Sequence, residues 1–156
     1  MNCWILQCNI NDYRWFDYMK QYANHLDTWG INRYISEIEL GDMVFVWLTQ
    51  YKGKETRGIY AMGKITGLPD KNRKPFDYGK PFWINKETEE RRRYLINLEL
   101  RYTFPYTDKL IHNPILKGKL EEAGLGDLLV IKRPRGTSIC EVPRGCETIK
   151  KMVETR

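Results

Sequence analysis

Residues 28–63 read TWGINRYISEIELGDMVFVWLTQYKGKETRGIYAMG, and this stretch decides the fold. Gly41-Asp42 is typical of a turn, and residues 43–49 after it are apolar and β-branched or aromatic, which predicts a buried strand. A charged hairpin tip follows, and Gly58 to Thr66 returns as the paired strand. The stretch therefore predicts a hairpin of two core strands, preceded by a polar, glycine-containing segment around Trp29.

The sequence before this stretch predicts a strand and a helix. Residues 2–8 form the expected strand, and Asp12 is a candidate N-cap for a helix that continues to about Leu26. The chain is expected to change direction at Trp29-Gly30. The first strand has two faces, one with Cys3, Ile5 and Gln7 and the other with Trp4, Leu6 and Cys8.

The sequence after this stretch adds strands, loops and short helices. Residues 69–81 contain three prolines and predict a surface loop, whereas the alternation of residues 91–102 predicts a half-buried strand. A helix or turn is expected from Asn113-Pro114 through residues 119–123, then an apolar segment near 128–132, and a closing helix over residues 146–153. Strands outnumber helices, and no βαβ repeat or linker is present. We expect an α+β fold, a small barrel of mixed strands with peripheral helices, as a single domain over residues 1–156.

Composition points to a polyanionic partner. The chain has 156 residues, of which 42% are hydrophobic, so it can build one core. Its net charge is +6 and its pI is about 9.1, and lysine and arginine gain by displacing counterions from phosphates. The alternative is a basic surface that binds nothing.

The sequence indicates neither a membrane span nor a metal site. No apolar run approaches the roughly 20 residues of a membrane span, and no signal sequence is evident, so we expect a cytoplasmic protein. The spacing of the four cysteines matches no zinc motif, and the two histidines are far from them, so we expect no metal and no cofactor. Reduced core cysteines are the default expectation, with a disulfide plausible for a hyperthermophilic source.

Catalytic motifs are not found. The sequence has no Walker-type phosphate loop, no G-x-G-x-x-G, no H-E-x-x-H and no G-x-S-x-G. Pro69-Asp70 could begin a metal-nuclease core, but the E-x-K that such a core needs is missing. With two histidines and no clustered carboxylates, an enzyme is not expected.

Five landmarks in order resemble those of the EVE domain, a family of the PUA-like superfamily of pseudo-barrels that is similar in fold to the YTH readers of methylated adenine. The similarity covers essentially the whole chain. The landmarks are Trp4 to Asn9, Trp29 to Tyr34, Gly41 to Trp47, Gly58 to Gly63, and Arg133 to Thr137.

The resemblance implies recognition of a modified, flipped-out base in an aromatic pocket. EVE domains also resemble the DNA-targeting modules of McrB-type restriction GTPases, so a GTPase motor and a nuclease subunit are candidate partners. Modified DNA is the favoured ligand, with RNA as an alternative: an RNA-binding accessory domain of an RNA-modification or translation factor. A third hypothesis is an enzyme on a PUA-like frame.

The resemblance also implies roles for individual residues. Trp29 and Trp47 supply stacking walls, Asn9 and Asn32 read base edges because an amide both donates and accepts, and Trp15 lies at the pocket rim. Cys8 and Thr137 add backbone or small polar contacts. Each tryptophan could instead be ordinary core, Trp47 above all. The candidate phosphate contacts are Arg33, Lys71, Arg73, Lys74, Lys132, Arg133 and Arg135.

Overall fold

A single seven-stranded sheet organises the chain. The computed structural model describes residues 2–22, 28–49, 56–73, 94–103, 114–132 and 139–155. The strands lie in the order β2-β5-β4-β3-β1-β7, with β6 paired to β4. The strands are β1 (Cys3–Cys8), β2 (Thr28–Ile31), β3 (Met43–Leu48), β4 (Gly58–Asp70), β5 (Tyr94–Thr103), β6 (Ile115–Leu116) and β7 (Ile139–Glu141).

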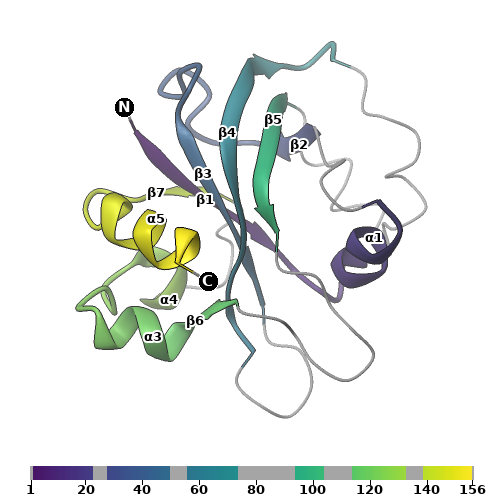
Figure 1. Ribbon diagram of the computed structural model, residues 1–156. Coiled ribbons are helices and arrows are strands. Elements are labelled where there is room, and N and C mark those ends of the chain that lie inside the picture. The colour runs from purple at the N-terminus through teal and green to yellow at the C-terminus, as the bar shows by residue number, and fades with distance from the viewer. Residues whose placement is uncertain are drawn as a thin grey trace.

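Helices lie on both sides of the sheet (Figure 1). One side carries α1, and the other carries α3, α4 and α5, which are consecutive along the chain apart from β7. Within the described residues, no helix is long and apolar enough to cross a membrane. The helices are α1 (Trp15–Tyr22), α3 (Lys117–Glu122), α4 (Leu129–Lys132) and α5 (Cys146–Glu154).

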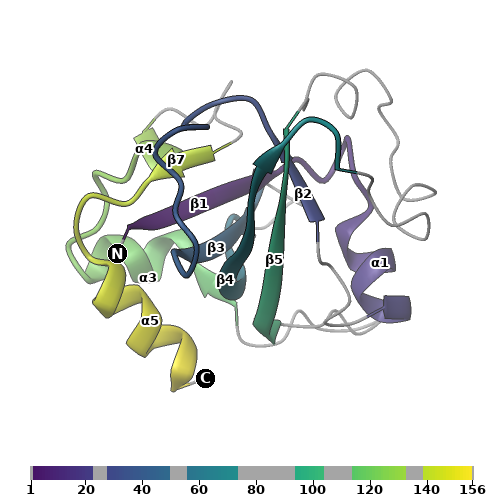
Figure 2. The same cartoon turned by 90° about the horizontal axis from the view of Figure 1, so that it is seen from above.

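The sheet is mixed and curls into a half-barrel (Figure 2). β1 pairs parallel with β3, whereas the other strand pairs are antiparallel. Register shifts interrupt the β3–β4 pair between Val46 and Trp47 and the β4–β5 pair at three points, and such bulges bend strands and increase their twist. The predicted α+β fold, a mixed barrel with peripheral helices, is confirmed.

Alternation of side chains along β1 and β3 divides the core in two. Trp4, Leu6 and Cys8 face one cluster of buried residues, together with Val44, Val46 and Leu48. Cys3, Ile5, Phe45 and Trp47 face the other, which the helices α3 and α5 cover through Leu120, Ile149 and Val153. The division follows from the period of two along a strand, since successive side chains point to opposite faces.

The expected hairpin, first strand and closing helix are confirmed. The long loop predicted from Pro69 is wrong at its start, because β4 continues to Asp70; residues 74–81 lie outside the described residues. The change of direction expected at Trp29-Gly30 is also wrong, since both residues belong to β2. Gly41 has a φ of +86°, a left-handed conformation that glycine adopts without strain, which explains the turn before β3.

The expectation of reduced cysteines is wrong for two of the four. Cys3 in β1 and Cys146 at the start of α5 form a disulfide, with their Cα atoms 6.2 Å apart. The bond fixes α5 to the edge of the sheet next to β7. Cys8 and Cys140 are free and buried. Burial raises the pKa of the Cys140 thiol from 9.0 to about 11, so this thiol stays protonated at neutral pH.

Candidate nucleic-acid interface

Three of the predicted pocket residues lie in one aromatic cluster. Trp29 comes from β2, Trp15 from the first turn of α1, and Cys8 from the end of β1. The ring centroids of Trp15 and Trp29 are 6.4 Å apart and the planes meet at 66°, an edge-to-face contact. Trp15 is fully buried, and 6% of the Trp29 surface is exposed. The two indoles therefore pack on each other beneath the surface, and Trp15 is not a residue of an open rim.

Trp47 does not join this cluster, so its pairing with Trp29 as the second wall of one slot is wrong. Trp47 belongs to the core on the opposite face of the sheet and is 1% exposed. The reason is the register of β3 on β1, where Cys8 lies opposite Leu48. Because side chains alternate, Leu48 shares the face of Cys8 and Trp47 points away.

Asn9 shapes the turn between β1 and α1. Its side-chain Oδ1 accepts the backbone N–H of Asn11 at 2.9 Å and lies 3.5 Å from the Thr49 hydroxyl, while its carbonyl accepts the N–H groups of Asp12 and Tyr13. The amide nitrogen of Asn9 forms no hydrogen bond to a described residue. This half-buried amide can thus donate to a ligand while its oxygen holds the turn. Asn32, just after β2, is exposed.

A buried donor lies within the aromatic cluster. The indole Nε1 of Trp15 is removed from solvent and has no hydrogen-bond acceptor among the described residues, and the same holds for the Trp47 Nε1 in the other core cluster. A buried N–H without a partner costs about 1 to 3 kcal/mol. Native structures contain few such groups, and each calls for a structural or functional explanation. Here an acceptor supplied by a ligand would remove the cost.

Fold and sequence together identify the family. The model of the EVE domain matches residues 2–152. The chain belongs to the EVE domain family. No curated protein matches the sequence.

Several solved structures share the fold of this EVE domain. A hypothetical protein from Leishmania major superposes with a TM-score of 0.61 at 14% identity, covering 99% of this chain and 96% of that one. A Pseudomonas putida protein is 18% identical with a TM-score of 0.57, covering 96% and 98%. Human THYN1, solved in complex with DNA containing 5-methylcytosine, is 14% identical with a TM-score of 0.59, covering 99% and 97%. At these identities the likeness establishes the fold.

Three of the predicted cations, Arg33, Lys71 and Arg73, follow the ends of β2 and β4. Arg33 is exposed, and its guanidinium carbon lies 5.6 Å from the centre of the Tyr34 ring. Lys71 is exposed in the turn after β4. Arg73 follows it and donates to the carbonyls of Leu68, at 2.9 Å, and Leu95, at 3.3 Å. This guanidinium therefore fixes the turn to β5. Arg73 was predicted to contact a phosphate, but the donors it would use already bind these two carbonyls.

Leu95 relates the position of the Lys71 turn to that of β2. In the sheet register it lies opposite both Gly30 of β2 and Asp70 of β4, so the Lys71 turn is close to the strand that carries Trp29. Lys132 lies apart from this group, exposed at the end of α4. Four predicted residues, Lys74, Arg133, Arg135 and Thr137, lie outside the described residues.

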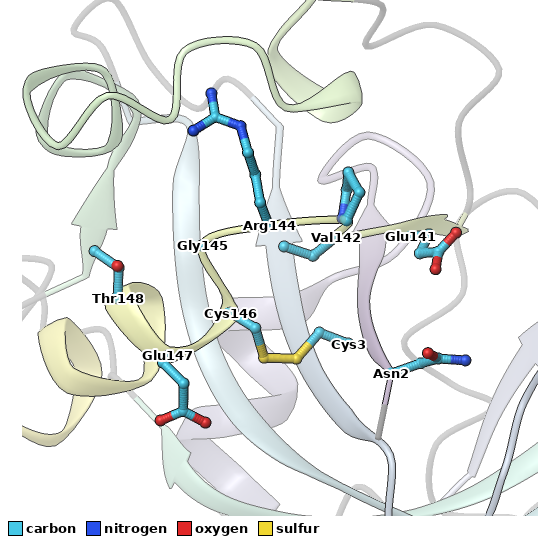
Figure 3. Close-up of a pocket in the computed structure, with 10 residues that line it drawn as sticks. Asn2, Cys3, Glu141, Val142, Arg144, Gly145, Cys146, Glu147 and Thr148 are labelled. Carbon is cyan, nitrogen blue, oxygen red and sulfur yellow. A yellow bond between two sulfur atoms is a disulfide. The ribbon is translucent and has the colours of Figure 1, made fainter.

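Two pockets adjoin the segment after β7, and neither was predicted from the sequence. One, of about 370 Å³, lies beside the Cys3–Cys146 disulfide and is lined by the first residues of α5 (Figure 3). The other, of about 260 Å³, lies between Tyr34 and α4. Both share Glu141, Pro143 and Arg144. Their residues are far apart in the sequence, and only Tyr34 lies within a landmark used for the family resemblance.

Proposed function

We propose that this EVE domain is a binding module without catalysis of its own, which recognises a modified base in a nucleic acid. The observation that carries the proposal is the buried Trp15–Trp29 pair, in which the Trp15 Nε1 lacks an acceptor among the described residues. The basic composition supports a polyanionic ligand. The structure of THYN1 with 5-methylcytosine DNA makes that base the first ligand to test.

Each residue of the pocket has a defined task in this proposal. Trp29 stacks on the base, which contributes about 1 to 3 kcal/mol. The Asn9 amide nitrogen and the Trp15 Nε1 donate to acceptors on the base edge. Arg33 and Lys71 contact the phosphates. A base taken from a duplex costs a few kcal/mol to flip, and these phosphate contacts, together with stacking, offset that cost.

Recognition requires a movement of Trp15. The Trp29 ring is almost fully covered, and the indole of Trp15 lies against it. A base can therefore contact the face of Trp29 only after the residues that cover this ring, Trp15 among them, move aside. Burial of one methyl group yields about 0.8 kcal/mol, about fourfold in affinity. Selectivity beyond fourfold has to come from the shape of the pocket that this movement opens.

Fluorescence anisotropy tests the proposal directly. The probes are one oligonucleotide with cytosine, 5-methylcytosine, adenine or N6-methyladenine at the same position, as duplex DNA, single-stranded DNA and RNA. We expect tighter binding of one modified DNA than of its unmodified counterpart, and weaker binding of all probes at higher salt because of the phosphate contacts. Equal binding of all probes, or a response that is flat in salt, contradicts the proposal.

The RNA probes decide the finer assignment. Preference for modified duplex DNA supports a targeting domain for a modification-dependent restriction system, with a GTPase motor and a nuclease as partners. Preference for RNA independent of modification supports the accessory-domain alternative instead.

Two tryptophans on opposite faces of the sheet offer a matched pair of variants. Trp29→Leu removes the stacking ring, so we expect binding of the preferred probe to weaken by about 1 to 3 kcal/mol. Trp47→Leu removes a ring of equal size from the other core cluster and is expected to leave affinity unchanged. Both variants lose core packing and are measured well below their unfolding temperatures, with circular dichroism as the check on folding. A larger loss of affinity in Trp47→Leu than in Trp29→Leu would indicate that the base binds on the Trp47 face of the sheet, and would contradict the proposal.

A further inference from the structure

The pocket of about 260 Å³ between Tyr34 and α4 forms a groove next to the proposed interface; we call it the Tyr34 groove. Tyr34 belongs to the segment that leads from β2 to β3, Leu128 and Leu129 lie at the start of α4, and Glu141 ends β7. Its lining residues are Tyr34, Asp127, Leu128, Leu129, Glu141, Pro143 and Arg144.

The size and walls of the groove fit one nucleobase. Its volume of about 260 Å³ is larger than one planar base needs, so a single base can enter it. Tyr34, Leu129 and Pro143 supply apolar walls, and Leu129 is 37% exposed, one of three large hydrophobic side chains exposed among the described residues. Small-ligand sites combine such walls with a few polar groups.

Tyr34 is held in place as a wall by its backbone and by its neighbours. Its φ of +59° is the only positive value for a residue other than glycine in the described chain. Bulky side chains rarely adopt this conformation unless their surroundings enforce it. The Tyr34 ring packs on Trp4, with centroids 5.2 Å apart, and the Arg33 guanidinium lies over it. The groove thus adjoins a predicted phosphate contact.

The two carboxylates of the groove differ in what they can bind. Asp127 accepts a hydrogen bond from Arg144 at 2.8 Å, and this bond, despite an opposing desolvation, lowers the pKa of its carboxyl. Its charge is therefore balanced. Glu141 is exposed and forms no ion pair with a described residue. A carboxylate only accepts hydrogen bonds, so Glu141 is free to accept one from a donor on a ligand.

We propose that the Tyr34 groove binds a second nucleobase, next to the modified one, and that Glu141 selects a base with an exocyclic amino group. The N4 amino group of cytosine is a donor that carboxylates accept, whereas uracil and thymine present a carbonyl oxygen at that position. Arg33, over Tyr34, lies where the phosphate between the two nucleotides would pass. The inference rests on the proposed function for its context, but the groove can be tested without a modified base.

Titration with two mononucleotides tests the groove. Cytidine and uridine 5′-monophosphates carry the same sugar and phosphate and differ at the N4/O4 position and its neighbouring ring nitrogen. We expect the cytidine nucleotide to shift the backbone amide NMR signals of Tyr34, Leu129 and Glu141, and to bind about tenfold more tightly than the uridine nucleotide. Equal affinities, or shifts confined to other parts of the chain, overturn the proposal.

Two variants assign the effect to named side chains. Glu141→Gln adds a donor beside the acceptor, so we expect the preference for cytidine to fall towards one. Leu129→Glu places a third carboxylate in the wall, at a position that is 37% exposed, and is expected to abolish binding of both nucleotides. The control is Glu154→Gln, which removes an exposed carboxylate 3.9 Å from Lys150 at the end of α5 and should change nothing. An unchanged preference in Glu141→Gln rejects the selection by Glu141.

The two proposals fail in different ways. Selective binding of a modified oligonucleotide with no nucleotide bound at the Tyr34 groove would reject the groove and keep the modified-base pocket. Cytidine binding at the groove with no selectivity for any modified oligonucleotide would reject the modified-base pocket and leave a nucleotide site.

Discussion

Loss of the Cys3–Cys146 disulfide is expected to lower the free energy of unfolding by about 4 to 5 kcal/mol. The two cysteines are 143 residues apart, so the bond closes a loop of almost the entire chain, and in the chain-entropy model a longer loop removes more freedom from the unfolded state. The bond also holds α5 on β1, where Ile149 and Val153 are buried. Urea unfolding followed by tryptophan fluorescence measures the difference between Cys146→Ser and the unchanged protein.

The reduced protein provides the control for this prediction. Reductant is expected to destabilise the unchanged protein by a similar amount and to have no effect on a protein with both Cys3→Ser and Cys146→Ser. Alkylation of the unfolded chain without reductant should label two thiols, those of Cys8 and Cys140. Labelling of all four would show that the disulfide is absent in solution.

The elements that the sequence predicts well are those with a strong local pattern. β3 and β4 contain continuous apolar runs beside a Gly-Asp turn, and α5 places Ile149 and Val153 one turn apart on one face. β2 has four residues, one of them glycine, and its pattern is too short to indicate a strand. It becomes a strand through pairing with β5, which is distant in sequence. Local propensity carries no information about that partner.

Trp47 was assigned to the pocket from its residue type alone, without knowing which face of β3 its side chain occupies. An aromatic residue at the end of an apolar strand is compatible with a pocket, but which face it occupies depends on how β3 pairs with β1. In the observed parallel register, Leu48 lies opposite Cys8. The alternation within each strand can be predicted locally, whereas the register between β1 and β3 cannot, because the segment that contains α1 and β2 separates the two strands in the chain.

The Cys3–Cys146 bond and the Tyr34 groove were not predicted from the sequence, because both depend on contacts between residues that are distant in the chain. Neither cysteine belongs to a recognisable spacing motif, and they meet because β7 pairs with β1 and α5 follows β7 directly. Tyr34 and Glu141 meet for the same reason, since Glu141 lies opposite Trp4 in the β1–β7 register and Trp4 contacts Tyr34. Such juxtapositions follow from topology, and no local pattern indicates them.

Asp42→Ala is expected to lower the free energy of unfolding by about 3 to 5 kcal/mol, although Asp42 is predicted from sequence only as a turn residue. Its carboxylate is 1% exposed and accepts three hydrogen bonds: from the Trp4 indole at 2.8 Å, the Glu39 N–H at 2.9 Å and the Asn2 N–H at 3.1 Å. Bonds to a charged group contribute about 1.5 to 3 kcal/mol each, and a buried donor left without a partner adds its desolvation cost.

The Asp42 substitution should also weaken nucleotide binding at the Tyr34 groove. Trp4 packs on Tyr34, and Glu39 belongs to the segment that carries Tyr34, so the three bonds position that wall. Urea unfolding measures stability, and titration with cytidine 5′-monophosphate measures the affinity of the groove for the nucleotide.

Asp70→Ala is the matched control, because Asp70 is exposed and its side chain accepts one bond, from the Asn72 N–H at 2.8 Å. Its expected cost is about 0.5 kcal/mol, as for most surface substitutions. Similar losses in the two variants would show that Asp42 is an ordinary turn residue and that the Tyr34 wall is held by other contacts.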